Sequence, residues 1–339
     1  MVTGHKLRGM EMNALKCTLA SVAMLTLAGS ASANTIKIST TVPDTSNWIV
    51  AAETFKTIVE EKTDHTVEIY PNGTLVSGND RVELEMAQAG AVEIVMKTTI
   101  WLSQLNQDFL VTAMPWMFPN AEVAMKVMDG PVGQGLSTSL NEVGLEALAW
   151  GDGGFFQLYS KGEPVKEPAG IAGVKIRVPG NPIFVKSWEA VGAVPTPISF
   201  AEIFSALQSG AIDGGVATTP LIYAKRFYEV APSISIINFS FESVGMIANA
   251  GFLSSLSEED RAIIREAALE GMKAQRAKAA EENTSYISEM EAAGAKIYVP
   301  TEAELNSFKE IAAPIYDSFK AEIGEELVSQ VEAAVEAAK

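Results

Sequence analysis

The sequence predicts an α/β protein with two similar lobes, and an internal echo is the first observation that predicts it. Residues 88–93 and 208–213 are near repeats: each ends an amphipathic helix with glycine and then starts a strand that carries a carboxylate. Each helix follows a predicted strand, residues 66–71 and 193–198, so the echo spans a whole β-α-β unit. Two such lobes leave a cleft between them. Small ligands bind where the carboxyl ends of parallel strands face a cleft.

Strand and helix signals alternate along the chain, as an α/β fold requires. The first helix is expected to start at Ser46 or Asn47, because the apolar residues that follow recur on one helical face. Later helices are expected after Asn181, where a proline follows the cap, and after Ser199, which forms a capping box with Glu202. The expected strands are residues 36–40, 66–71, 92–96, 144–150, 174–178, 193–198 and 296–299.

Three further segments complete the predicted elements. Residues 257–260 start a helix that is expected to run to about residue 291, which is long for a globular domain and enough to brace both lobes. Residues 301–304 cap the first of the closing helices. The glycine-rich segment 130–135 lacks a preceding apolar strand and phosphate-binding spacing, so it is expected to be a loop.

The N-terminus predicts export. Basic residues precede the apolar run 17–28, and the small residues 30–33 match a cleavage site, so residues 1–33 are predicted to be a signal peptide with Asn34 as the mature start. The apolar run is shorter than the roughly 20 residues that a transmembrane helix needs. The one cysteine, Cys17, lies inside this signal, so the mature chain is expected to have no disulfide and no membrane anchor.

The charge balance excludes some partners. Loss of residues 1–33 removes three basic residues and one acidic residue, so the formal charge of −17 becomes −19. Nucleic acid and anionic lipid would repel such a chain.

The remaining chain, residues 34–339, exceeds what one hydrophobic core usually serves, which predicts two domains. No Pro/Ser-rich linker separates them, so the lobes are expected to be joined by crossing strands. The predicted first lobe comprises residues 34–153 and about 243–281. The second comprises residues 154–242 and about 282–339.

Five segments, in this order and behind a secretory signal, resemble the DctP-type substrate-binding proteins of TRAP transporters. They are YPNGTL at 70–75 followed by Asp80-Arg81, GVKIRVP at 173–179, VGAVPTP at 191–197, ALQSGAIDG at 206–214 and KRFYEV at 225–230. The resemblance covers nearly the whole mature chain. It implies a two-lobed, Venus-flytrap periplasmic binding protein that closes on a small organic anion. It also implies delivery to a cation-gradient-driven membrane permease. A monomer is expected.

Arg177 is the strongest candidate for a ligand contact. It is predicted near the end of an apolar strand, where few side chains reach the cleft, and its planar fork can hold a carboxylate by two parallel hydrogen bonds. In the family, the arginine of this Lys-x-Arg-x-Pro context clamps the ligand's carboxylate. The alternative on sequence grounds is a surface salt bridge.

An aromatic residue replaces the second anchor of better-known relatives. Aligning residues 153–157 with the family puts Phe156 where sialic-acid binders carry another arginine, with Gln157 beside it. An aromatic ring can stack on an apolar or cationic ligand group but cannot pair with a carboxylate. Core packing is the alternative for both Phe155 and Phe156. Phe200 matches a position that lines the family pocket, with packing again as the alternative.

Polar residues at the expected strand ends are further candidates. Thr218 and Thr219 replace an asparagine of other branches and could donate hydroxyl hydrogen bonds, or form an ordinary turn. Keto-acid-binding relatives hold a cation with residues that are absent here, so no metal and no cofactor are expected. In the first lobe, Lys97 and Thr98 hold the equivalent strand end, and Asn47 and Trp48 lie in the first strand-to-helix loop.

Two rival functions remain open. The mature chain has a single histidine, His65, and no cysteine, so nucleophilic catalysis has little to work with, although a carbohydrate-active enzyme using paired carboxylates is an alternative. A sensor protein that presents its ligand to a membrane receptor would share the fold. One arginine with aromatic neighbours favours a monocarboxylate or sulfonate, or a zwitterion, over a polyanionic sugar acid.

Overall fold

The computed structural model describes residues 34–339, which belong to one compact unit beginning at Ser32. The predicted signal peptide lies outside the described residues. The strands are β1 Thr35–Ser39, β2 Thr66–Tyr70, β3 Ile94–Thr98, β4 Leu145–Ser160, β5 Lys175–Val178, β6 Val194–Pro197, β7 Gly214–Thr218, β8 Ser233–Ser235, β9 Phe241–Asn249 and β10 Lys296–Tyr298. The α-helices are α1 Asn47–Lys62, α2 Asp80–Gln88, α3 Thr99–Leu102, α4 Ala121–Asp129, α5 Pro131–Ser139, α6 Pro182–Ala190, α7 Ile203–Ser209, α8 Thr219–Ala224, α9 Ala250–Ser255, α10 Glu258–Ala292, α11 Glu302–Ile323 and α12 Glu325–Ala338. Within this part of the chain, no helix combines the length and apolarity that a membrane crossing requires.

The strands form one mixed sheet in the order β2-β1-β3-β9-β4-β7-β5-β6, with β8 beside β4 and β10 beside β8. β1 is parallel to β2 and β3, and β5 is parallel to β6 and β7. β9 is antiparallel to both β3 and β4. We call the half with β1, β2, β3 and β9 the first lobe, and the half with β5 to β8 and β10 the second lobe. A parallel core in each half confirms the predicted two-lobed α/β fold.

A single long strand, β4, passes from the first lobe to the second. It pairs with β9 up to Phe155 opposite Phe241, and with β7 from Phe156 opposite Thr218. The partner therefore changes between two adjacent residues, and a crossing strand joins the lobes as predicted. The lobe boundaries at residues 153 and 242 stay a prediction.

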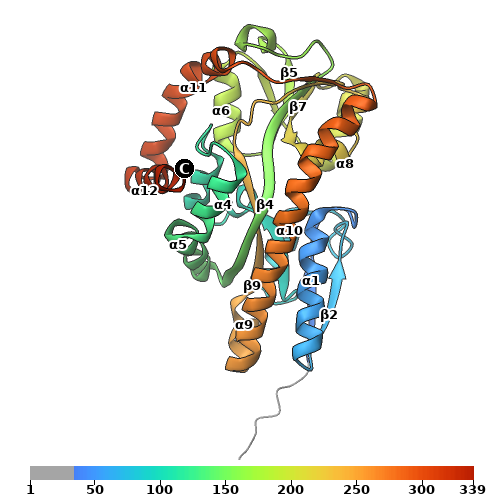
Figure 1. Cartoon of the computed structure of the whole chain (residues 1–339), viewed down its shortest axis with the longest axis vertical. Coiled ribbons are helices and arrows are strands. Elements are labelled where there is room, and N and C mark those ends of the chain that lie inside the picture. Colours follow the sequence, from blue (N-terminus) through green and yellow to red (C-terminus); the bar gives the residue numbers. More distant parts are fainter. Residues whose placement is uncertain (1–33) are drawn as a thin grey trace, which may run out of the picture. The chain divides into compact units, whose positions relative to one another are not determined.

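The long helix α10 braces both lobes, as the capping sequence at Ser257 predicts (Figure 1). In the first lobe it packs against α1, where a Cβ on Gly271 would lie only 2.6 Å from the backbone oxygen of Ala51. In the second lobe it contacts α8, and the rings of Tyr286 and Tyr223 stack with centroids 4.1 Å apart. Glycine thus permits the close approach at one end, and aromatic stacking fixes the other.

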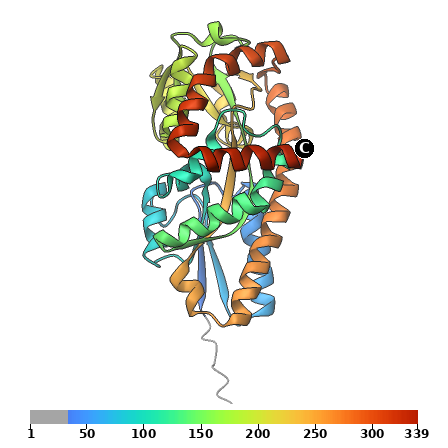
Figure 2. The ribbon, with the colours of Figure 1, turned by 90° about the vertical axis from the view of Figure 1, so that its left-hand side faces the viewer.

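The two closing helices pack against different parts of the chain, and their grouping with the second lobe stays a prediction. α11 packs against α6 of that lobe, but α12 packs against α4 and α5 (Figure 2). Val328, Val331 and Val335 recur on one face of α12 and are buried. This apolar stripe has to be covered, and the helices of the first-lobe segment cover it.

Most predicted helix starts are confirmed. The Ser46 side chain accepts a hydrogen bond from the Trp48 amide at 3.3 Å, and Asn181 accepts one from the Ile183 amide at 2.9 Å. The capping box at Ser199 is present, although the first turn after it is a 3₁₀ turn. The repeat also behaves as predicted, because its glycines end α2 and α7 in left-handed conformation: Gly90 at φ +71° and Gly210 at φ +76°.

The expected loop at residues 130–135 is wrong, because α5 starts at Pro131. Proline is well suited to the first helical position, since its missing amide hydrogen would be unpaired there. A Cβ on Gly133 would lie 1.7 Å from the backbone oxygen of Met128, at the end of α4. The glycines therefore allow two helices to turn tightly against each other; they do not mark an open loop.

Candidate functional site

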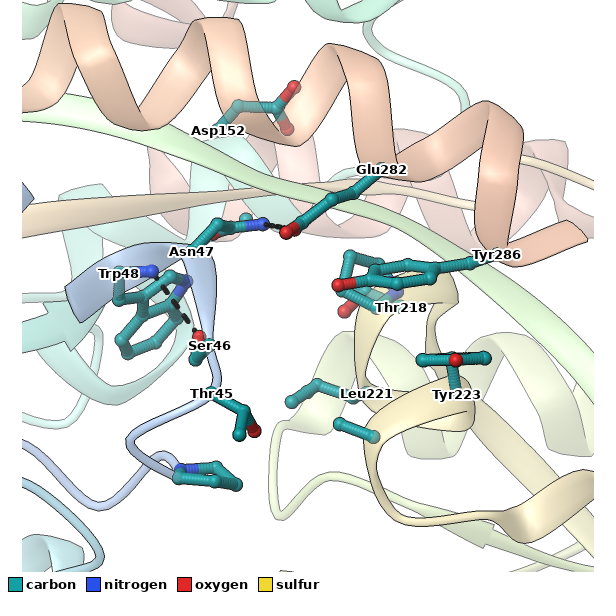
Figure 3. A pocket seen from close by; sticks show the side chains of 14 residues that line it. Thr45, Ser46, Asn47, Trp48, Asp152, Thr218, Leu221, Tyr223, Glu282 and Tyr286 are labelled. Carbon is teal, nitrogen blue, oxygen red and sulfur yellow. Dashed lines mark hydrogen bonds between the residues drawn. The ribbon is translucent and has the colours of Figure 1, made fainter. Parts of the chain in front are cut away.

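An open cavity lies where the two lobes meet, and its empty space is about 620 Å³ when the adjoining solvent is counted (Figure 3). Asn47 and Trp48 at the start of α1 face Tyr223 and Tyr286 across the opening. The first-lobe loop before α1, the middle of β4, the end of β7, α8 and α10 all contribute. The lining residues are Pro43, Thr45, Ser46, Asn47, Trp48, Asp152, Gly153, Thr218, Pro220, Leu221, Tyr223, Ala224, Glu282 and Tyr286. They include two carboxylates and no basic side chain.

Hydrogen bonds tie α1, β4 and α10 together beside this cavity. The Asn47 side chain donates to Glu282 at 2.8 Å and accepts from Gln275 at 2.8 Å. Gln275 also donates to the backbone oxygen of Asp152 at 2.7 Å and accepts from its amide at 2.9 Å. Asn47 lines the cavity, but its side-chain amide group is already used in holding the wall.

Asp152 is a buried acid of this wall. Burial raises the pKa of its carboxyl group, while the hydrogen bond from the Gly154 amide and the charge of Arg276 oppose the shift. The Gly154 amide donates to Oδ1 at 2.8 Å.

Arg177 lies on β5 outside the cavity lining, and it is only 7% exposed. Its Nε donates to the backbone oxygen of Ile198 at 3.2 Å, and its guanidinium carbon lies 5.8 Å from the centre of the Phe200 ring. Among the described residues, no carboxylate approaches it within the 4.0 Å of an ion pair. The structure thus brings Arg177 and Phe200 together, and it rules out a surface salt bridge for Arg177.

The electrostatic surroundings of Arg177 come from β4 and β9. Burial lowers the pKa of Arg177, and the neighbouring Tyr159 and Glu242 oppose that shift. An arginine side chain stays protonated in proteins, so its charge persists in this buried region. The Tyr159 hydroxyl is buried without a hydrogen-bond partner in the described structure. A buried charge and an unused donor favour an anion between the lobes.

Glu242 is the acid that faces this arginine. It stands near the start of β9, opposite Gly154 of β4, and is 6% exposed. Burial raises the pKa of its carboxyl group to about 7, with Thr98 and Arg177 opposing the shift and Asp80 adding to it. A Cβ on the cavity residue Gly153 would lie 3.2 Å from Cγ of Glu242, so this side chain packs against Gly153 behind the cavity wall and is not itself part of the lining.

The predicted residues at the two strand ends have different surroundings. Lys97 is buried and forms ion pairs with Asp80 and with Glu83, whose Oε2 lies 2.5 Å from the lysine Nζ. The Thr98 and Thr218 hydroxyls are buried without a well-formed hydrogen bond in the described structure. Of these residues, only Thr218 lines the cavity. Thr219 is buried at the first position of α8, also outside the lining.

Phe156 and Gln157 do not line the cavity. Phe156 is 3% exposed, and its ring packs edge-on against Phe184 with centroids 4.7 Å apart, so it belongs to the core. Gln157 accepts a hydrogen bond from the Asn238 amide at 3.0 Å and donates to its side chain at 2.7 Å. It therefore ties down the segment before β9. Phe155 is half-buried against Phe241.

Several residues of this region were not predicted from the sequence. Glu242 could have been found as the one acidic residue in an apolar strand of nine residues, all of them buried in the structure. Glu282 and Tyr286 lie four residues apart on α10, which puts them on one helical face. Asp152 and Tyr223 carried no comparable signal. Within residues 34–339, no cluster of three or more His, Cys, Asp or Glu side chains is arranged to hold a metal ion.

Comparisons with known proteins give one consistent result. The family described as "Bacterial extracellular solute-binding protein, family 7" (DctP) matches residues 38–322. The C4-dicarboxylate-binding periplasmic protein DctP of Rhodobacter capsulatus is 30% identical over 296 residues, covering 86% of this chain and 88% of that protein.

Solved structures agree with that result. The sugar acid binding protein DctPAm of Advenella mimigardefordensis, in complex with galactonate, has a TM-score of 0.87 and 27% identity, covering 91% of this chain and 100% of that chain. A TRAP periplasmic solute binding protein of Ralstonia eutropha with bound (S)-2-acetolactate has a TM-score of 0.85 and 26% identity, covering 89% and 99%. These are binding proteins for transport.

Proposed function

Because the chain belongs to family 7 of the bacterial extracellular solute-binding proteins, we propose that it captures a small organic acid for delivery to a TRAP membrane permease. Membership makes it a binding protein and removes the enzyme as a rival. The predicted signal at residues 1–33 and the family both support a periplasmic location.

One observation carries this proposal: Arg177, on β5 of the second lobe, is buried and lacks a carboxylate partner in the described structure. A desolvated guanidinium without an ion pair is costly, whereas a ligand carboxylate can offset that cost through two parallel hydrogen bonds. The ring of Phe200 and the unused hydroxyl of Tyr159 lie near Arg177 and could contact the rest of the ligand.

The ligand carries one acidic group, a carboxylate or a sulfonate. Lys97 is already held by two carboxylates, and Phe156 stands where the alignment with sialic-acid binders has a second arginine. A second acidic group would therefore have no basic partner near Arg177. Galactonate and acetolactate, bound by two similar proteins, each carry a single carboxylate. The dicarboxylate named for the Rhodobacter relative marks the competing possibility.

A thermal-shift screen of organic anions, followed by calorimetry on the hits, tests this function. Monocarboxylates or sulfonates should raise the melting temperature and be recovered unchanged, because ligand that binds only the folded state stabilises it. A dicarboxylate or sialic acid that binds more tightly than every monoanion would contradict the ligand class.

Closure of the lobes on the ligand is a second consequence. If β4, β9 and α10 act as a hinge, saturating ligand should shift the population toward a more compact form. Small-angle scattering should then show a smaller radius of gyration with ligand. Capture from membranes should recover a permease; recovery of a receptor kinase alone would favour the sensor alternative.

A further inference from the structure

Glu242 is a buried acid that its neighbours Thr98 and Arg177 compensate only in part. No side-chain hydrogen bond or ion pair of Glu242 is present among residues 34–339 that meets ordinary geometric limits. The charged groups that face it are Arg177 from β5 and Asp80 from α2. An ionised carboxylate in such a place is costly unless a positive charge or a proton compensates it.

The buried and half-buried charges around Glu242 are out of balance. Asp80 pairs with Lys97, Lys97 also pairs with Glu83, and Arg177 faces Glu242. Two positive side chains thus accompany three negative ones. An acidic ligand on Arg177 would increase the excess of negative charge in a region that water scarcely reaches. A ligand that also carries a positive charge would leave the charge balance of this region unchanged.

The cavity near Glu242 also has more acidic than basic side chains. Gly153 separates the Glu242 side chain from the cavity, whose lining contains the carboxylates of Asp152 and Glu282 and no basic side chain. Its walls include the rings of Trp48, Tyr223 and Tyr286. Aromatic faces next to carboxylates form the environment that binds ammonium groups.

We propose that Glu242 recognises a cationic group of the ligand, so that the solute is a zwitterion with its acidic group on Arg177 and its ammonium group beside Glu242. This inference rests on the proposed function and narrows its ligand class. It also moves the recognition of positive charge from Phe156, which lies in the core, to a carboxylate that lies directly behind the cavity residue Gly153.

Calorimetry with isosteric ligand pairs tests the proposal directly. The probes are trimethylammonio carboxylates of increasing spacer length and the matching acids in which carbon replaces nitrogen, for example glycine betaine and 3,3-dimethylbutanoate. The best charged member should bind about tenfold or more tightly than its isostere, because close charge pairs in desolvated sites reach such couplings. Isosteres that bind equally well throughout the series would overturn the inference.

Two variants and a pH series sharpen this test. Glu242→Gln should lose most of the preference for the charged ligand, whereas Glu163→Gln, an exposed acid of the second lobe paired with Lys296, should keep it. In the unmodified protein, affinity for the charged ligand should rise between about pH 6 and pH 8 as Glu242 releases its proton. The Gln variant should lose that slope. If affinity falls over this range, Glu242 takes up a proton when the ligand binds, as it would with a simple anion. That result would overturn the proposal.

The failure of this inference differs from the failure of the proposed function. Plain carboxylates that bind through Arg177 without any preference for a cationic group would overturn the inference alone. Absence of binding by every organic acid, charged or not, would overturn both. Thermal unfolding of the unliganded Gln variant shows whether a lost preference comes from a damaged fold.

Discussion

The two β-α-β units of this protein repeat each other in backbone but differ in chemistry at the ends of their central strands. β3 ends in Lys97 and Thr98, and β7 ends in Ala217 and Thr218. In both, the threonine precedes a short helix and its hydroxyl makes no cap hydrogen bond. The lysine of the first unit is held by Asp80 and a second acid, while alanine fills the matching position of the second unit.

The carboxylates that repeat, Glu93 and Asp213, stabilise the fold. Glu93 accepts a hydrogen bond from the Lys37 amide at 2.9 Å, and Asp213 approaches the Lys175 amide at 3.4 Å. Each carboxylate thus joins its own strand to the parallel neighbour at the start of the pair. The sequence repeat therefore indicates the shared fold of the two units, and the residues that differ between them indicate the candidate site.

The difference also indicates where an acidic ligand should lie. The cation of the first lobe is neutralised within that lobe, whereas Arg177 of the second lobe faces only Glu242 across the junction. The second lobe should therefore hold the acidic group, and the first lobe should mainly close over it.

Replacing Lys97 by Met should have the largest effect. It leaves the buried Glu83 and the half-buried Asp80 without a positive charge, which should lower the free energy of unfolding by about 3 to 5 kcal/mol. Urea denaturation measures this loss. Lys62→Met removes an exposed ion pair with Glu266 and should cost less than about 1 kcal/mol. Equal stability of the two variants would contradict the division of roles between the lobes.

Arg177→Ala should act on binding and spare the fold. Losing the charged contact should weaken ligand binding by about 2 to 5 kcal/mol, much of it from leaving the ligand's charge unpaired. The unfolding free energy should change little, because the guanidinium has no ion pair in the described structure. Arg226→Ala is the control, since that side chain is 67% exposed. Calorimetry that finds affinity within about threefold of the original would remove Arg177 as the anchor.

Patterns of the sequence could predict the fold because local rules decide it. The helix starts at Ser46 and Asn181, the long helix α10 and the paired lobes all follow from caps, periodicity and the repeat. The position of α12 could not be predicted, because which lobe covers an apolar helix face depends on contacts distant in sequence. The helix at Pro131 was missed because glycine at a close helix contact has the same appearance as glycine in a loop.

The candidate site was predicted only in part. Asn47, Trp48 and Thr218 line the cavity, since the ends of strands and the starts of helices face it. Phe156 lies in the core, at the point where β4 stops pairing with β9 and starts pairing with β7. No local sequence pattern predicts that change of partner strand. Glu242 lies on the other crossing strand, and its importance appears only when β9 is seen beside β4.

Glu242→Gln should raise stability at alkaline pH. Burial raises the pKa of the folded carboxyl to about 7 from an ordinary value of 4.5. Between these values the unfolded chain releases its proton first, so rising pH destabilises the folded protein, by about 3 kcal/mol near pH 8. The Gln variant lacks this loss and should gain stability there, but not near pH 4, where both states hold the proton. Urea denaturation measures the unfolding free energy of both proteins against pH. If the two curves stay parallel, the charge of Glu242 is already compensated in the unliganded protein, and the prediction is wrong.

Replacing the two strand-end threonines by valine should have the smallest effect and gives the finest comparison of the lobes. Valine keeps the shape and removes a hydroxyl that has no partner in the described structure, so stability should stay equal or rise slightly. Thr218→Val should weaken ligand binding by about 0.5 to 1.5 kcal/mol, because Thr218 lines the cavity and its hydroxyl is available to a ligand. Thr98→Val should weaken ligand binding less, since Thr98 lies outside the cavity lining and next to Glu242.

Calorimetry of both variants with the best ligand of the screen measures this difference in binding. A larger loss at Thr98 would assign the main polar contacts to the first lobe and reverse the comparison.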